Sequence, residues 1–205
     1  VLATSRAATQ ADAIGVNVGA GAVGASVATA TSGAKVHAKV GESAAIGGAS
    51  FDLVAKRDLK GGAPTAQAHA LGAAGGLLLG ANGSVATAQS TGETVAAVGA
   101  NSTITTSGTA AVKSENASLQ SASSFGVATG LRSLGANFSY ATSDSLTQAS
   151  LGDNVAVSGE ELQVSATGND GNYSFAKAGA GGLTLIGGES GVGKERMARL
   201  IHDES

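Results

Sequence analysis

The sequence predicts an all-β protein whose chain forms a repetitive parallel β-solenoid (β-helix). Three observations lead to this prediction. Similar strings recur at a regular spacing of about 55 residues, short runs alternate between apolar and small polar side chains, and glycine and alanine are abundant. Alternation over a short run is typical of a β-strand, and recurrence at a fixed spacing is typical of stacked repeats.

The composition already limits what the chain can be. Glycine and alanine account for 32 and 42 of the 205 residues, aromatic residues for 3%, and cysteine is absent. Small side chains fit a narrow interior in which neighbouring backbones approach closely, and a chain without cysteine has no disulfide framework. A net charge of -3 leaves no long basic stripe, so we expect no nucleic acid contact. No run of 18 apolar residues occurs, so we expect no membrane span.

Four sets of strings define the repeat. The first is similar to Ser-Val-Ala-Thr and occupies residues 26–29, 84–87 and 139–142. The second begins with Val-Gly or Leu-Gly and occupies residues 40–43, 98–101 and 151–154. The third occupies residues 51–54, 109–112 and 161–164, and glycine-rich segments occupy residues 19–21, 75–77, 130–131 and 181–183. We therefore expect three units, about 14–70, 71–124 and 125–179, within a repeat region of residues 1–187.

The repeat also predicts which residues are equivalent. We expect one trio at Val27, Val85 and Tyr140, and a second trio at Val54, Val112 and Val164. If one coil takes roughly 18 to 27 residues, each unit contains two or three coils. A helical repeat is the alternative, and it is disfavoured because glycine costs about 1 kcal/mol at each helical position.

Local patterns assign strands and turns within the units. Alternation at residues 103–105 and 155–157 predicts strands. The pairs 153–154 and 169–170 and the serine-rich stretch 121–124 are interpreted as turns. The basic cluster of Lys56, Arg57 and Lys60 is interpreted as a solvated loop insertion.

Residues 152–167, which read Gly-Asp-Asn-Val-Ala-Val-Ser-Gly-Glu-Glu-Leu-Gln-Val-Ser-Ala-Thr, resemble the repeats of giant bacterial surface adhesins. Those adhesins are the filamentous-haemagglutinin-like and autotransporter-like β-helical proteins, and the resemblance extends over about residues 11–185. It implies a secreted or surface-attached shaft, part of a longer protein, outside the cell or on the bacterial surface. The expected partners are a ligand on a host or neighbouring cell, or further copies through solenoid stacking. No catalytic residue is implied, and no cofactor is expected.

The C-terminal segment, residues 188–205, departs from this pattern because charged residues are far more frequent in it than in the repeat region. It contains the Walker A-like string Gly188, Glu189, Ser190, Gly191, Val192, Gly193, Lys194 and Glu195. Backbone N–H groups of such a loop cradle phosphate oxygens, and the lysine ammonium reaches the β- and γ-phosphates.

The segment closely resembles the Walker A region of sigma-54-dependent transcription activators, which are bacterial ATPases of the AAA+ class. That resemblance implies an alternative function: a cytoplasmic, ATP-binding fragment of a regulator, with magnesium. It also implies a short helix over residues 194–202, with Met197, Leu200 and Ile201 on one side. In the other interpretation the segment is a further coil, in which Val192 corresponds to Tyr140 and is expected, like Tyr140, to point inward.

Other function classes find less support in the sequence. His37, His69 and His202 lack the spacing of metal ligands, so no metal site is expected. An enzyme acting on polysaccharide would need clustered carboxylates, whereas the acidic residues are scattered. Residues 103–105 form a Thr-Ile-Thr string like those of ice-binding solenoids, but it occurs once. We therefore expect a structural and adhesive protein rather than an enzyme.

Overall fold

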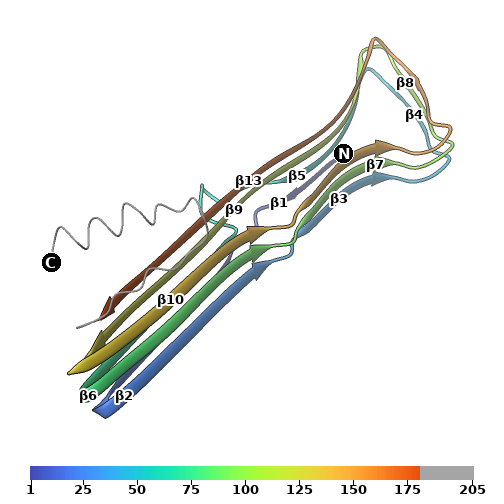
Figure 1. Cartoon of the computed structure of the whole chain (residues 1–205). Coiled ribbons are helices and arrows are strands. Elements are labelled where there is room, and N and C mark those ends of the chain that lie inside the picture. Colours follow the sequence, from blue (N-terminus) through green and yellow to red (C-terminus); the bar gives the residue numbers. More distant parts are fainter. Residues whose placement is uncertain (181–205) are drawn as a thin grey trace.

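The computed structural model describes residues 1–180. All regular structure in these residues is β-strand, and every strand pairing is parallel (Figure 1). The largest sheet contains β1 (Leu2–Ser5), β2 (Thr9–Ser32), β5 (Phe51–Arg57), β6 (Ala66–Ser90), β9 (Thr109–Thr129), β10 (Arg132–Ser143) and β13 (Glu161–Ala180). The second contains β3 (Lys35–Val40), β7 (Glu93–Val98) and β11 (Leu146–Leu151). The third contains β4 (Ala45–Gly48), β8 (Thr103–Thr106) and β12 (Ala156–Ser158). The prediction of an all-β chain with parallel pairing is confirmed.

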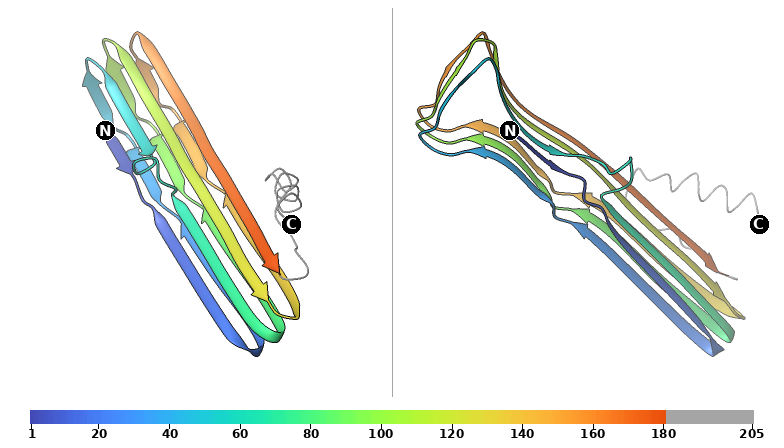
Figure 2. Two further views of the ribbon diagram at one scale, coloured as in Figure 1. Left: turned by 90° about the vertical axis from the view of Figure 1, so that its left-hand side faces the viewer. Right: turned by 180° about the vertical axis from the view of Figure 1, so that it is seen from behind.

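One pass of the chain is much longer than expected. Leu2 pairs with Val54, and Phe51 pairs with Ala110, so each strand lies against the strand one full sequence repeat away. The sequence repeat is therefore one complete pass, and the expected division of each unit into two or three shorter coils is wrong. One pass is long because it contains two long strands joined by a short three-sided end, as in β6 and β9, which are joined through β7 and β8 (Figure 2).

The pairing register confirms part of the predicted equivalence. Val27 pairs with Val85 as expected, but Phe138 and not Tyr140 pairs with Val85. Val112 pairs with Val164 as expected, but its partner on the preceding pass is Leu53, so Val54 was assigned one position too late. Both errors arise because the repeats were aligned by residue type. In a parallel sheet the paired residues are instead those at the same number of residues from the preceding turn.

The string Val-Gly or Leu-Gly marks a turn that is repeated on all three passes. Val40, Val98 and Leu151 pair in register as predicted. Shortly after each of them, Ser43, Asn101 and Asn154 have φ of 56°, 57° and 55°. The left-handed region is costly for residues with a Cβ, and asparagine tolerates it better than most, which explains the two asparagines at this turn.

The long arms reverse direction at the glycine-rich segments. Residues 66–75 of β6 pair with β9, whereas residues 79–90 of the same strand pair with β10, so the large sheet curls on itself between them. A Cβ added to Gly76 would collide with the carbonyl oxygen of Leu79. Glycine is therefore required at this reversal because the backbone folds against itself.

The wider end of the molecule, which we call the head, has a conventional apolar core. It contains the second and third sheets together with β1, β5, residues 109–116 of β9 and residues 161–168 of β13 (Figure 1). The three sides of the head enclose ten buried apolar residues, among them Leu53, Ile104 and Val112, which are fully buried. The large aliphatic side chains of the interior are gathered here.

The narrow part of the molecule, the shaft, consists of β2, β6, β10 and the remainders of β9 and β13. Its hydrophobic cluster consists of alanine alone: Ala28, Ala30, Ala66, Ala68, Ala70, Ala86, Ala88, Ala122 and Ala141. The two layers lie so close that polar side chains of one layer face glycines of the other. A Cβ on Gly72 would lie 2.5 Å from Asn82 Oδ1, and one on Gly126 would lie 2.6 Å from Asn137 Oδ1. The abundance of glycine and alanine thus corresponds to the narrow interior expected from the composition.

Three local interpretations are wrong. Residues 121–124 and 169–170 lie inside β9 and β13 and are not turns. Ser124 and Arg57 are buried, so neither the serine-rich stretch nor the basic cluster is simply solvated. Ser124 and Arg57 are polar residues of the interior, which composition alone does not distinguish from residues of a surface turn. The residue pair 153–154 does lie in a turn, as predicted.

Candidate interaction surface

The sequence-predicted nucleotide site lies outside the described residues. This applies to all of residues 188–195, to the helix expected over residues 194–202 and to the alternative of a further coil. The described residues form no group of three or more His, Cys, Asp or Glu side chains that could hold a metal ion. Among residues 1–180 no helix could cross a membrane. The candidate sites within residues 1–180 are therefore surfaces of the head and the shaft.

Aromatic side chains occupy the outside of the shaft. The chain has six aromatic residues, and only Phe51, in the head, belongs to a buried core. Phe125, Phe138, Tyr140 and Tyr173 are exposed and Phe175 is half-buried. Aromatic residues usually contribute most to cores and to interfaces, so their position outside an alanine interior indicates contact surfaces.

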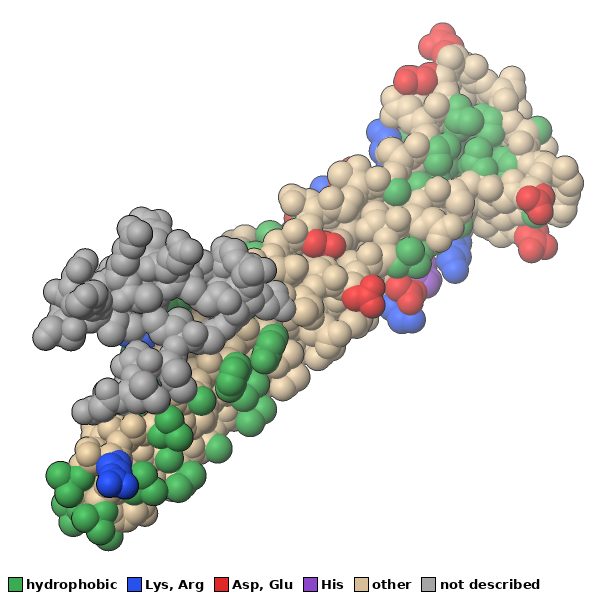
Figure 3. All heavy atoms as spheres, in the orientation of Figure 1, with side chains coloured by type: hydrophobic (Ala, Val, Ile, Leu, Met, Phe, Trp, Pro, Cys, Tyr) green, Lys and Arg blue, Asp and Glu red, His purple; other side chains and the backbone are tan. Residues whose placement is uncertain are grey.

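One side of the shaft forms a flat surface that we call the outer face. It consists of the outward residues of three neighbouring strands: 21, 23, 25, 27, 29 and 31 of β2; 79, 81, 83, 85, 87 and 89 of β6; and 132, 134, 136, 138, 140 and 142 of β10. Its rows place similar residues side by side, as in Val27, Val85 and Phe138. Arg132 is its single charged residue. Figure 3 shows apolar side chains along the lower part of the shaft, with few charged ones among them.

The other side of the shaft carries a second, smaller apolar ladder. Ile14, Leu71 and Phe125 pair in register and point outward. The next residue in the row is Lys177, whose ammonium lies 5.7 Å from the centre of the Phe125 ring. This distance is within the range of a cation–π contact, so a positive charge is held over the end of this ladder.

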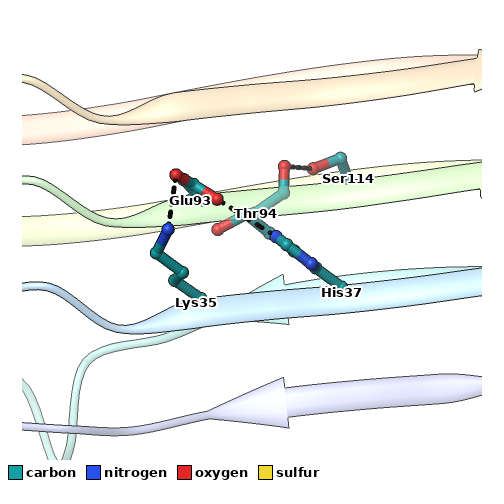
Figure 4. A network of polar contacts seen from close by, with 5 residues as sticks. All are labelled: Lys35, His37, Glu93, Thr94 and Ser114. Atoms are coloured by element: carbon teal, nitrogen blue, oxygen red, sulfur yellow. Dashed lines mark hydrogen bonds and ion pairs between the residues drawn. The ribbon is translucent and has the colours of Figure 1, made fainter.

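A charged row lies where the shaft meets the head (Figure 4). Glu93 of β7 accepts a hydrogen bond of 2.9 Å from Lys35 Nζ, and its other oxygen lies 3.3 Å from His37 Nε2. The hydrogen bond from Lys35 is the main cause that lowers the pKa of Glu93 below its ordinary value. These side chains are on the surface of the second sheet, and the row marks the end of the outer face.

Beneath this row a buried arginine connects two passes. Arg57 is 1% exposed, and its two Nη atoms donate hydrogen bonds of 2.9 Å to Ser90 Oγ and Ser32 Oγ. Burial lowers the pKa of the guanidinium from its ordinary value. Ser114 Oγ donates a further buried hydrogen bond of 2.7 Å to the carbonyl of Thr94 (Figure 4). This polar layer joins the alanine interior of the shaft to the aliphatic core of the head.

A shallow pocket of about 230 Å³ lies on the outside of the same junction. Residues of three neighbouring passes line it, including Lys56, Glu115 and Asn169. Lys56 Nζ lies 3.0 Å from Glu115 Oε2, and this contact raises the pKa of Lys56. The lining contains two basic residues, Lys56 and Arg57, and two acidic ones, Asp58 and Glu115, so the pocket presents no excess of either sign.

The outer face was not predicted from the sequence, because a large side chain such as Tyr140 was expected to point inward. Val27 and Tyr140 point outward, while the alanines that follow them in sequence, Ala28 and Ala141, point inward. The signal was present in the alternation of large and very small side chains within the string Val-Ala-Thr-Ala-Thr. An alanine-rich chain can place either half of such an alternation inside, and here the smaller half is inside.

Comparisons with known proteins found no match: no family model, no curated protein and no solved structure is similar to this chain.

Proposed function

We propose that this chain is a structural segment of a large secreted or cell-surface bacterial adhesin, built as a β-solenoid, without catalysis. The observation that carries the proposal is the register: parallel partners lie one sequence repeat apart throughout residues 1–180. A chain that repeats one pass in register can lengthen by adding passes, which suits a shaft that holds a binding module away from a surface.

The interior and the exterior of the shaft support a structural role. Alanine, glycine, serine and asparagine fill the space between the layers, so the shaft interior offers no room for a ligand. The adhesive contact is therefore proposed on the outside, where the exposed aromatic and aliphatic side chains lie. A ligand on a host or neighbouring cell is the expected partner.

Localisation is the property that tests this proposal. Antibodies against the 205-residue chain should label intact cells that produce it, and treatment of those cells with an external protease should remove the label. Permeabilised cells are the control for total protein. Label that appears only after permeabilisation would contradict a secreted or surface function.

A second candidate function rests on residues 188–195, whose sequence matches the front of a phosphate-binding loop. Such a loop needs a preceding strand in an α/β sheet and an acidic residue to hold magnesium, and the described residues supply parallel β-structure only. We therefore expect weak or no ATP binding. Titration with labelled ATP and magnesium tests this expectation, and micromolar binding that Lys194→Ala abolishes would favour the regulator.

A further inference from the structure

We propose that the outer face of the shaft is a self-association surface that pairs, face to face, with the outer face of a second copy of this chain. All of its residues except Arg132 are uncharged, and Leu134, Phe138 and Tyr140 are exposed on its last strand. Clusters of exposed apolar residues on a protein surface commonly mark interaction sites.

The size of the outer face is sufficient for a pair. Each strand contributes about 12 residues at ~3.3 Å, and three strands lie ~4.8 Å apart, which gives about 570 Å² on each copy. Two copies together would bury about 1,140 Å², above the ~1,000 Å² that a specific interface requires. The face is thus large enough for a reversible dimer, and it lies below the size of obligate dimer interfaces.

The chemistry of the outer face favours a second copy over a charged partner. A surface whose single charge is Arg132, in its first row, offers little to select an ionic ligand, and two such faces repel each other little. The rows of similar residues form a regular sheet surface, and two sheet surfaces of this kind pack closely.

The charges at the two ends of the face suggest how the copies are oriented. Arg132 lies in the first row, whereas the row beyond the last holds the ion pair of Lys35 and Glu93, whose charges offset each other. A two-fold axis between the row of Val85 and the row of Thr87 would hold the two Arg132 side chains at opposite ends of the interface, so that their positive charges do not meet. The same axis places Phe138 and Tyr140, midway along the last strand, against the same residues of the other copy, and aromatic residues are prominent contributors to binding.

Sedimentation velocity of the whole 205-residue chain over a range of concentrations tests the proposal. Val27 and Val16 are on the same strand, on opposite faces, and are 65% and 66% exposed. Val27→Lys should weaken dimerisation at least tenfold, and Val16→Lys should leave it unchanged. A chain that is monomeric at all concentrations, or two variants with equal effects, would overturn the proposal.

A cross-linking experiment keeps the test valid if a lysine variant does not fold. The chain has no cysteine, so one introduced cysteine is the only thiol, and its cross-link reports a single contact. Thr87→Cys, beside the proposed axis, should give a covalent dimer with a bis-maleimide reagent long enough to span two sheets packed ~10 Å apart, and Ala73→Cys, on the other face of the same strand, should not. Equal cross-linking at both positions, or binding to lipid vesicles without dimerisation, would overturn the proposal.

Pairing of this kind deepens the proposed function, because it would let adhesin shafts associate side by side. The two proposals fail separately. A monomeric chain on the cell surface would refute pairing alone, and a dimeric chain found only inside the cell would refute the adhesin alone.

Discussion

Gly99 is the position at which the stacking of successive passes can be tested by adding a single methyl group. A Cβ built on Gly99 would lie 2.6 Å from the backbone nitrogen of Glu42 and 2.6 Å from the carbonyl carbon of Gly41, on the preceding pass. Ordinary contacts of a Cβ with such atoms are 3.4 Å or longer. The turns of two passes would therefore have to separate by several tenths of an ångström.

The preceding pass supplies a matched control. Gly41 occupies the equivalent place in its own turn, because Val40 pairs with Val98, and a Cβ on Gly41 would meet no atom within 4 Å. Neither glycine has a positive φ, so alanine is compatible with both backbones. The two substitutions therefore differ only in the contact with a neighbouring pass.

We expect Gly99→Ala to lower the free energy of unfolding by about 1–3 kcal/mol, because backbone atoms must move to admit the methyl group. Gly41→Ala should change it by less than about 0.5 kcal/mol, or raise it slightly by restricting the unfolded chain. Urea denaturation followed by circular dichroism measures both. Equal effects of the two substitutions would refute the stacked turns.

Three further predictions follow from single residues. Asn101→Ala should destabilise the chain by about 1–2 kcal/mol, since alanine is strained at a φ of 57°, and Asn101→Gly should not; denaturation in urea compares them. Arg57→Ala should destabilise by about 2–4 kcal/mol, because it leaves a cavity and two buried hydroxyls without their donors, whereas Arg57→Met, which fills the space, should cost less in the same assay. Glu93 has a pKa below its ordinary value of 4.5, so its ion pair with Lys35 stabilises the protein above pH 4.5 and is lost as the pH falls through the lowered pKa. The difference in the free energy of unfolding between wild type and Glu93→Gln should therefore shrink as the pH falls through that range. A constant difference across the acid range would argue against the pairing.

The repeat itself could be predicted from the sequence because its turns carry a distinct chemical requirement. The glycine-rich reversals and the turns after Val40, Val98 and Leu151 demand special residues, and these recur visibly. The spacing of these signals matches the length of one pass closely. Nothing in the spacing shows how many bends one pass contains, and for this reason the coil length was wrong.

The direction of the side chains could not be predicted because the interior of the shaft has no large apolar residues. Large apolar side chains are normally buried, and Tyr140 was accordingly expected to point inward. In the shaft the two layers are held close by alanines and by glycine opposite Asn82 and Asn137. Packing between backbones overrides hydrophobicity there, and only the three-dimensional structure shows it.

The register between passes decides which residues are neighbours, and cysteine pairs on β6 and β10 test it. Phe138 pairs with Val85, whereas Tyr140 lies further along the strand, opposite Thr87. In-register Cα atoms would be ~4.8 Å apart and those of the offset pair about 8 Å, beyond the ~7 Å limit for a disulfide. Oxidation of dilute protein, followed by mass spectrometry of the linked peptides, should link Val85→Cys with Phe138→Cys and fail to link Val85→Cys with Tyr140→Cys. A disulfide in the offset pair alone would contradict the register on which this account rests.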